Sequence, residues 1–88
     1  MPSFLVETYI SRANAGERDA SERRARSAAG ERKQVSFERS IHVPEDEICF
    51  FVFDAPSSEE VALVAERADL EPIRIVEAVS SASPKEDR

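Results

Sequence analysis

Three charged residues in apolar segments are the first candidates for chemistry in this sequence. Glu7 and Glu77 lie in apolar runs near the two ends of the chain, and Arg39 lies in a third run between them. Carboxylates on an apolar face need a cation, a proton or a hydrogen-bond donor, because an unpaired charge is costly there. Arg39 would supply that cation in a structural ion-pair cluster, whereas a metal ion or a ligand would make the same place a binding site.

The chain also contains one histidine and one cysteine, His42 and Cys49, on either side of a turn that begins at Pro44. Both residue types bind transition metals, so they are the candidates for a nickel or other metal site. Strand alternation places them on opposite faces, which weakens the pairing. We therefore expect His42 to be an exposed residue at a strand end and Cys49 to be a small buried one.

The elements that position these residues follow from hydrophobic periodicity. Four apolar segments predict strands, at 4–10, 34–43, 48–53 and 73–79. A helix is predicted from residue 15 to about 33, and a second one after Ser57 with its core side at Val61, Leu63, Val64, Ala65 and Ala68. Asn14 with Glu17, and Ser57 with Glu60, have the spacing of capping boxes.

The resulting βαββαβ order predicts one α+β domain over residues 1–79. Right-handed crossovers place both helices on one face of a four-stranded antiparallel sheet of order 4-1-3-2, which is the ferredoxin-like arrangement. Residues 80–88 have no pattern and are predicted to form a disordered tail. The other face of the sheet has no helix to cover it.

This open face is the predicted working surface of the protein. Strand parity assigns to it eight apolar residues, Leu5, Tyr9, Phe37, Ile41, Phe51, Phe53, Ile75 and Val79, with Glu7, Arg39 and Glu77 among them. A monomer rarely exposes so large an apolar patch. We therefore expect a homodimer packed sheet to sheet, with either a fully packed interface or a ligand cavity between the two sheets.

Composition argues against several other functions. The net charge of −6 disfavours general binding to nucleic acids or anionic membranes. Aromatic residues on an open sheet can stack RNA bases, but the carboxylates among them and the lack of a basic rim argue against that use. The opening residues read as a strand and not as a signal peptide, and no apolar run is long enough to span a membrane. We expect a cytoplasmic protein.

Several segments resemble a family of small bacterial proteins. They are Phe4-Leu5-Val6-Glu7, the stretch RSIHVPEDEICF at 39–50, Phe53-Asp54-Ala55-Pro56-Ser57, and RIVEAV at 74–79. The family is catalogued as a domain of unknown function, and some members are described as nickel-binding or nickel-responsive. The resemblance covers most of residues 1–79 and implies a ferredoxin-like homodimer. In the nickel-type members a histidine falls near Arg39 and a cysteine near Phe51, and this chain has neither.

No definite activity follows from these observations. The first hypothesis is a non-enzymatic dimeric binding or stress-responsive module that uses Glu7, Tyr9, Phe37, Arg39, Phe51 and Glu77 on its open face. The second is a protein that binds nickel or another transition metal. The third, by analogy of fold alone, is a cofactor-independent enzyme on a dimeric ferredoxin-like sheet.

Overall fold

The chain alternates strands and helices in the predicted βαββαβ order. The computed structural model describes residues 1–79, so the prediction of a disordered tail lies outside the described residues. The elements are β1 (Ser3–Tyr9), α1 (Ala15–Gly30), β2 (Ser36–Val43), the 3₁₀ turn η1 (Pro44–Asp46), β3 (Ile48–Asp54), α2 (Ser58–Arg67) and β4 (Pro72–Ala78). All neighbouring strands are antiparallel and the sheet order is β2-β3-β1-β4. This confirms the ferredoxin-like α+β fold.

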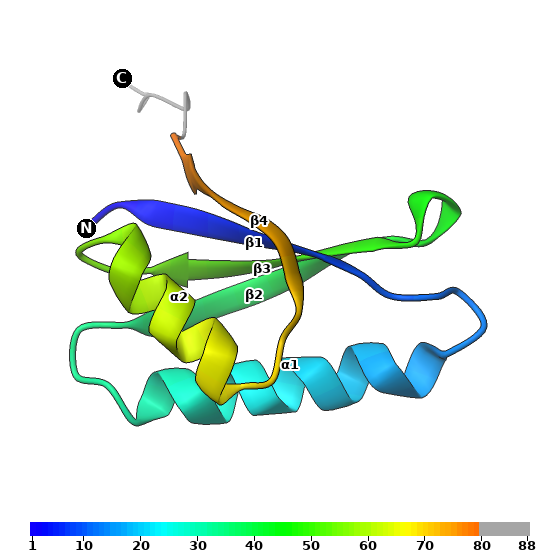
Figure 1. Cartoon of the computed structure of the whole chain (residues 1–88), viewed down its shortest axis with the longest axis horizontal. Coiled ribbons are helices and arrows are strands. Elements are labelled where there is room, and N and C mark those ends of the chain that lie inside the picture. Colours follow the sequence, from blue (N-terminus) through cyan, green and yellow to red (C-terminus); the bar gives the residue numbers. More distant parts are fainter. Residues whose placement is uncertain (80–88) are drawn as a thin grey trace, which may run out of the picture.

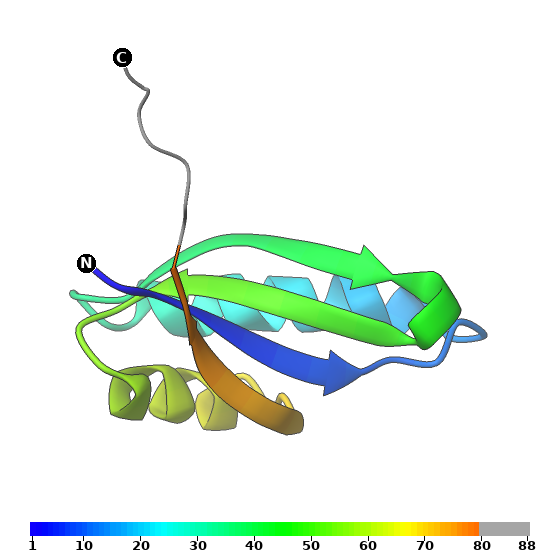
Figure 2. The ribbon, with the colours of Figure 1, turned by 90° about the horizontal axis from the view of Figure 1, so that it is seen from above.

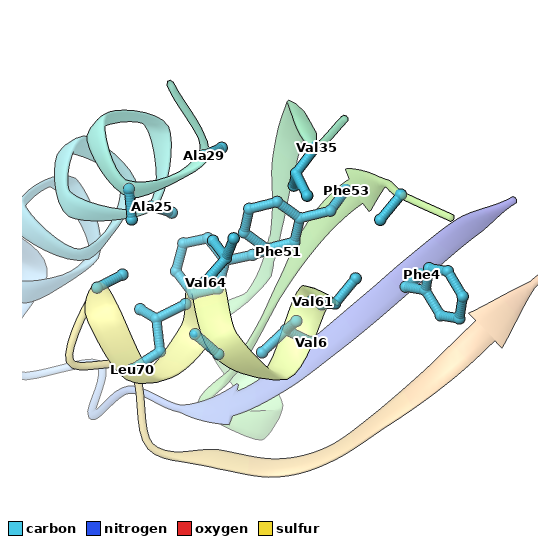
Figure 3. Close-up of a cluster of buried hydrophobic side chains, with 14 of the residues drawn as sticks. Phe4, Val6, Ala25, Ala29, Val35, Phe51, Phe53, Val61, Val64 and Leu70 are labelled. Atoms are coloured by element: carbon cyan, nitrogen blue, oxygen red, sulfur yellow. The ribbon is translucent and has the colours of Figure 1, made fainter. Parts of the chain in front are cut away.

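Both helices lie on the same side of the sheet, as Figure 1 shows. They enclose a core in which Val6, Phe51 and Phe53 from the sheet meet Val61 and Val64 from α2, all fully buried (Figure 3). The helix α1 contributes only small side chains to this core, among them Ala25, Ala28 and Ala29. Within residues 1–79, no helix lies in front of the opposite face of the sheet (Figure 2).

The helix ends differ in part from the predicted caps. Helix α1 ends at Gly30, three residues earlier than predicted, and the side chain of Asn14 makes no capping hydrogen bond. The side chain of Glu17 instead accepts hydrogen bonds from Ser21 and Arg24. At α2, Ser57 Oγ does accept a hydrogen bond from the backbone N–H of Glu60 over 3.4 Å, as expected of an N-cap.

Helix α2 buries the predicted core residues with one exception. Val61, Val64, Ala65 and Ala68 are buried, whereas Leu63 is 46% exposed on the outer side of the helix. Leu63 precedes the buried Val64, and a helix turns by about 100° per residue, so both cannot face the sheet equally. Within residues 1–79, neither helix is long and apolar enough to cross a membrane.

Candidate functional site: the open face of the sheet

The register of the sheet defines the residues of the open face. Val6 points into the core, so its neighbours Leu5 and Glu7 lie on the other face, together with their partners on adjacent strands. These residues are Leu5, Glu7 and Tyr9 on β1, Arg39, Ile41 and Val43 on β2, Ile48, Phe50 and Val52 on β3, and Arg74, Val76 and Ala78 on β4. Tyr9 and Ile41 are 60% and 42% exposed.

The structure therefore corrects half of the predicted site. Glu7, Tyr9 and Arg39 lie on the open face as predicted, whereas Phe37, Phe51 and Glu77 do not. Phe51 is fully buried on the helix side, and the ring of Phe37 packs against it with centroids 6.4 Å apart. Glu77 is the cross-strand partner of Phe4, another core residue, so Glu77 lies on the helix side of the sheet and the residues before and after it lie on the open face. Phe53 and Ile75, also predicted on the open face, pack in or against the core.

A β-bulge explains the error on β2. The register with β3 shifts between Phe37 and Arg39, so the two residues lie on opposite faces although they are two positions apart. Phe37 thus contacts the core and lies 4.8 Å from the guanidinium carbon of Arg26 on α1, while Arg39 is exposed on the open face. The extra residue, Glu38, borders the open face too.

The bulge forms one side of a groove on the open face, which we call the sheet groove. Its volume is about 370 Å³. Apolar side chains of Leu5, Ile41, Val52, Ala78 and Val79 line it together with the polar residues Ser3, Glu38, Arg39 and Asp54. A groove with an apolar floor and a few polar groups at its rim has the composition of a small-molecule site.

Two carboxyl groups meet at the end of this groove. Ser3 Oγ donates a hydrogen bond of 2.6 Å to Asp54 Oδ1, and this bond holds the pKa of Asp54 below its ordinary value. The pKa of Glu38 is raised, first by a hydrogen bond with Asp54 and then by the negative charge of Asp54. Glu38 therefore takes up a proton more readily than an isolated glutamate, and the pair is suited to sharing a proton or meeting a hydrogen-bond donor.

The ion pair on the open face involves a residue that the sequence did not indicate. Arg74 Nε donates a hydrogen bond of 2.7 Å to Glu7 Oε1, whereas Arg39 forms no ion pair within residues 1–79. The predicted cluster of Glu7, Arg39 and Glu77 is thus replaced by a pair between adjacent strands. Glu7 and Arg74 are cross-strand partners on β1 and β4. Such a pair can be predicted only when the register of the two strands is known.

The structure also corrects the placement of His42 and Cys49. They are direct partners on β2 and β3 and lie on the same, helix-covered face. Cys49 is fully buried, as predicted, and burial raises the pKa of its thiol to about 11. Nε2 of His42 is buried too and has no hydrogen-bond partner among residues 1–79. Among residues 1–79, no three His, Cys, Asp or Glu side chains gather closely enough to hold a metal ion.

Sequence reasoning missed Ser3, Glu38, Asp54 and Arg74. Ser3 and Asp54 end two strands that pair directly, so the antiparallel order of β1 and β3 would have brought them together. Glu38 lies between Phe37 and Arg39, which strand parity predicts on the open face, so parity alone predicts Glu38 on the covered face. Only the bulge brings it to the groove.

Comparisons with known proteins show the fold of this chain and no more. No protein-family model matches the sequence, and no curated protein matches it. A crystal structure of SCO4226 from Streptomyces coelicolor A3(2) matches with a TM-score of 0.77 and 21% sequence identity, over 91% of this chain and 99% of that one. The similarity supports the ferredoxin-like arrangement, and the resemblance to a nickel-binding family stays a prediction.

Proposed function

We propose that this protein is a homodimeric binding module in which the open faces of two copies pack together over the sheet groove. The observation that carries this proposal is the composition of that face. It presents partly exposed apolar side chains on all four strands, with no helix over them in the described chain. Patches of this kind on small domains mark interaction surfaces.

A second copy of the chain fits this face because the face carries both signs of charge. A two-fold interface brings the same surface patch of each copy together, so the patch must be complementary to itself. Arg39 and Arg74 supply positive charge, while Glu38 and Asp54 supply negative charge at one end of the groove. A chain of 88 residues alone also buries a smaller fraction of its unfolded surface, about 60–65%, than a larger domain does, so association adds to its stability.

The partner in such a dimer covers the sheet groove and encloses a small ligand there. The apolar floor at Leu5, Ile41 and Val52 fits an apolar body, and the rim groups Arg39, Glu38 and Asp54 fix a polar end. We infer binding as the primary role, because the groove combines apolar side chains with a few charged groups that can orient a ligand. Native mass spectrometry of the protein as purified tests this directly. We expect a dimer with a small organic adduct that Arg39→Ala loses, and an adduct that survives this change would place the ligand elsewhere.

The dimer itself is tested by sedimentation equilibrium on a matched pair of variants. Ile41→Glu introduces a charge on the edge strand β2, in the lining of the sheet groove, and Leu63→Glu introduces the same charge at a similarly exposed leucine on the outer side of α2. We expect Ile41→Glu to weaken dimerisation by about 30-fold or more, because it places a charge in the apolar part of the interface, and Leu63→Glu to leave it unchanged. A wild-type chain that stays monomeric at concentrations on the order of 100 µM would refute the proposal.

Metal binding is the second candidate function, and the pairing of His42 with Cys49 favours it. The two side chains start from directly opposed positions and share a face, so both can reach one metal ion. A metal would have to displace the thiol proton, and it would provide a partner for the unbonded Nε2 of His42. Stoichiometric Ni²⁺ uptake that disappears in both His42→Ala and Cys49→Ala would support this role. Uptake that neither change affects would exclude this pair as the site.

A further inference from the structure

The surface between the two helices contains a second groove, independent of the open face. The end of α2 lies against the middle of α1, where Nε of Arg24 donates a hydrogen bond of 2.7 Å to the carbonyl oxygen of Ala68 (Figure 1). Beside this contact is a groove of about 340 Å³. Its space exists because α1 presents the small side chains of Ala20, Ser27 and Ala28 there. We call it the interhelical groove.

Three arginines line the interhelical groove, namely Arg23 and Arg24 from α1 and Arg67 from α2. The one acidic residue in its lining is Glu31. The lining has three positive charges and one negative charge, and Glu17 bonds Arg24 from beside the lining, so the local formal charge is +1, although the whole chain has a net charge of −6. Positive charge concentrated in a groove of an acidic protein attracts anions to that place.

Two of these guanidinium groups are held in position by the protein. Arg24 is bonded to Ala68 through Nε and to Glu17 through Nη2, and Arg67 is bonded to Glu31 through Nε and Nη2. Nη1 of each makes no hydrogen bond within residues 1–79, and neither does the guanidinium of Arg23. An anchored guanidinium loses less side-chain entropy when it binds a ligand, so unbonded donors on anchored arginines favour binding.

We propose that the interhelical groove binds the phosphate group of a small phosphomonoester. The unbonded donors of Arg23, Arg24 and Arg67 outnumber what the two oxygens of a carboxylate can accept, and they suit the three acceptor oxygens of a phosphate group, which carries about −1.5 to −2 at neutral pH, better. Guanidinium groups also bind phosphate oxygens through paired N–H donors. The volume of the groove lies near the lower end for ligand sites, which suits a small molecule. The hydroxyl group of Ser27 supplies a further donor at the same surface.

The test is an NMR titration of ¹⁵N-labelled protein with phenyl phosphate, inorganic phosphate and benzoate at low ionic strength. We expect phenyl phosphate to shift the amide signals of Arg23, Ser27 and Arg67 with a Kd on the order of 1 mM. Arg23→Gln should weaken this binding by about 10-fold, because a charge-assisted hydrogen bond is lost. Arg23 makes no ion pair within the described chain, so this change leaves the fold intact.

Arg12→Gln is the matched control, because it removes the same charge from the loop between β1 and α1, outside the groove. It should change binding by less than about 2-fold. Equal weakening in both variants, or benzoate binding as tight as that of phenyl phosphate, would overturn the proposal. Absence of shifts up to about 10 mM ligand would overturn it as well. If inorganic phosphate binds as tightly as the ester, the site recognises phosphate itself, which supports the proposal without a role for the organic part.

Discussion

Glu7 on β1 accepts a hydrogen bond from Arg74 on β4 over 2.7 Å, and Arg39, two strands away on β2, takes no part in that pair. The side chain of Arg74 is 65% exposed and that of Glu7 is 18% exposed, so the pair lies at the surface of the single chain. Exposed pairs contribute little to stability, because water screens the charges and ordering two long side chains costs entropy. Because Arg74 forms this pair and Arg39 does not, the two arginines should differ in how much their replacement changes the free energy of unfolding.

We expect Arg39→Ala to change the free energy of unfolding by less than about 0.5 kcal/mol and Arg74→Ala by less than about 1 kcal/mol. The measurement is urea unfolding in an Ile41→Glu background, which is designed to keep the chain monomeric. A loss of about 2–4 kcal/mol in Arg39→Ala would mean that Arg39 neutralises buried carboxylates, as the sequence suggested.

Phe50 and Phe51 are neighbours on β3 that face opposite sides of the sheet. Phe51 is fully buried under the helices, whereas Phe50 is half-buried on the open face. In the same monomeric background, Phe51→Ala should destabilise the fold by about 3–5 kcal/mol, because it leaves a cavity in the core. Phe50→Ala should lower the free energy of unfolding clearly less than Phe51→Ala does. In a chain that is otherwise native, Phe50→Ala should weaken the dimer. Equal losses of stability in the monomer would contradict this assignment of faces.

The elements and their order could be predicted from the sequence, because periodicity and turn residues are local signals. The faces could be predicted only in part. On β3 both alternating sets are apolar, so Phe51 and Phe50 were equally good candidates for the core. On β2 the bulge reverses the alternation at Glu38, and no local signal marks it. On β4, parity predicts Ile75 on the open face, but Ile75 packs against the core instead.

The sites depend on contacts between distant segments, which explains why fewer of their residues could be predicted. Arg74 reaches Glu7 only through the register of β1 with β4. Ser3 and Asp54 meet because two strand ends are paired. The interhelical groove depends on the place where α2 crosses α1, and sequence periodicity does not give a crossing position.

The two helix starts should respond differently to alanine. Ser57 caps α2 through its side chain, whereas Asn14 at the start of α1 makes no such bond. We expect Ser57→Ala to lower the free energy of unfolding by about 1 kcal/mol, because one N–H group of the first turn loses its partner. Asn14→Ala should change it by less than about 0.5 kcal/mol. Urea unfolding of both variants measures the difference, and equal effects would show that Asn14 caps its helix in solution.

Burial of Cys49 should make the protein less stable at alkaline pH. Burial raises the pKa of its thiol from an ordinary value of 9.0 to about 11, so the folded state retains a proton that the unfolded state has lost. The corresponding stability is complete below pH 9 and disappears as the pH rises through about 11.

As the pH rises from about 8.5 to about 10.5, the urea midpoint of the native chain should therefore fall more steeply than that of Cys49→Ala. This range is chosen around the two pKa values of the thiol. The pKa of Tyr9 is also raised, but Tyr9 is present in both proteins and its effect cancels in the comparison. Parallel pH profiles would show that the thiol reaches solvent. As an independent check, a thiol reagent should react slowly with the folded chain and quickly in denaturant, because the attacking species is the thiolate.

The two carboxyl groups at the sheet groove should give pH effects of opposite direction at acidic pH. The raised pKa of Glu38 means that its contribution to stability is complete below its ordinary pKa of 4.5 and is lost as the pH rises through the raised folded value. Asp54 has a lowered pKa, so its contribution is present above its ordinary pKa of 3.8 and is lost as the pH falls through the lowered value. Where both groups are ionised they repel each other, and this repulsion is the second cause of the raised pKa of Glu38, after its hydrogen bond with Asp54.

Glu38→Gln should therefore raise the urea midpoint at pH 7, and this gain should shrink as the pH falls through the raised pKa of Glu38 towards 4.5, because Glu38 takes up a proton in the native chain over that range. The gain should also shrink at high salt, because both carboxyl groups reach solvent and are screened. Glu45→Gln removes an exposed carboxylate from the η1 turn and serves as the control for net charge. If both changes raise the midpoint equally, the effect comes from the overall charge of the acidic chain. A gain restricted to Glu38→Gln locates the repulsion at the groove where the proposed ligand binds.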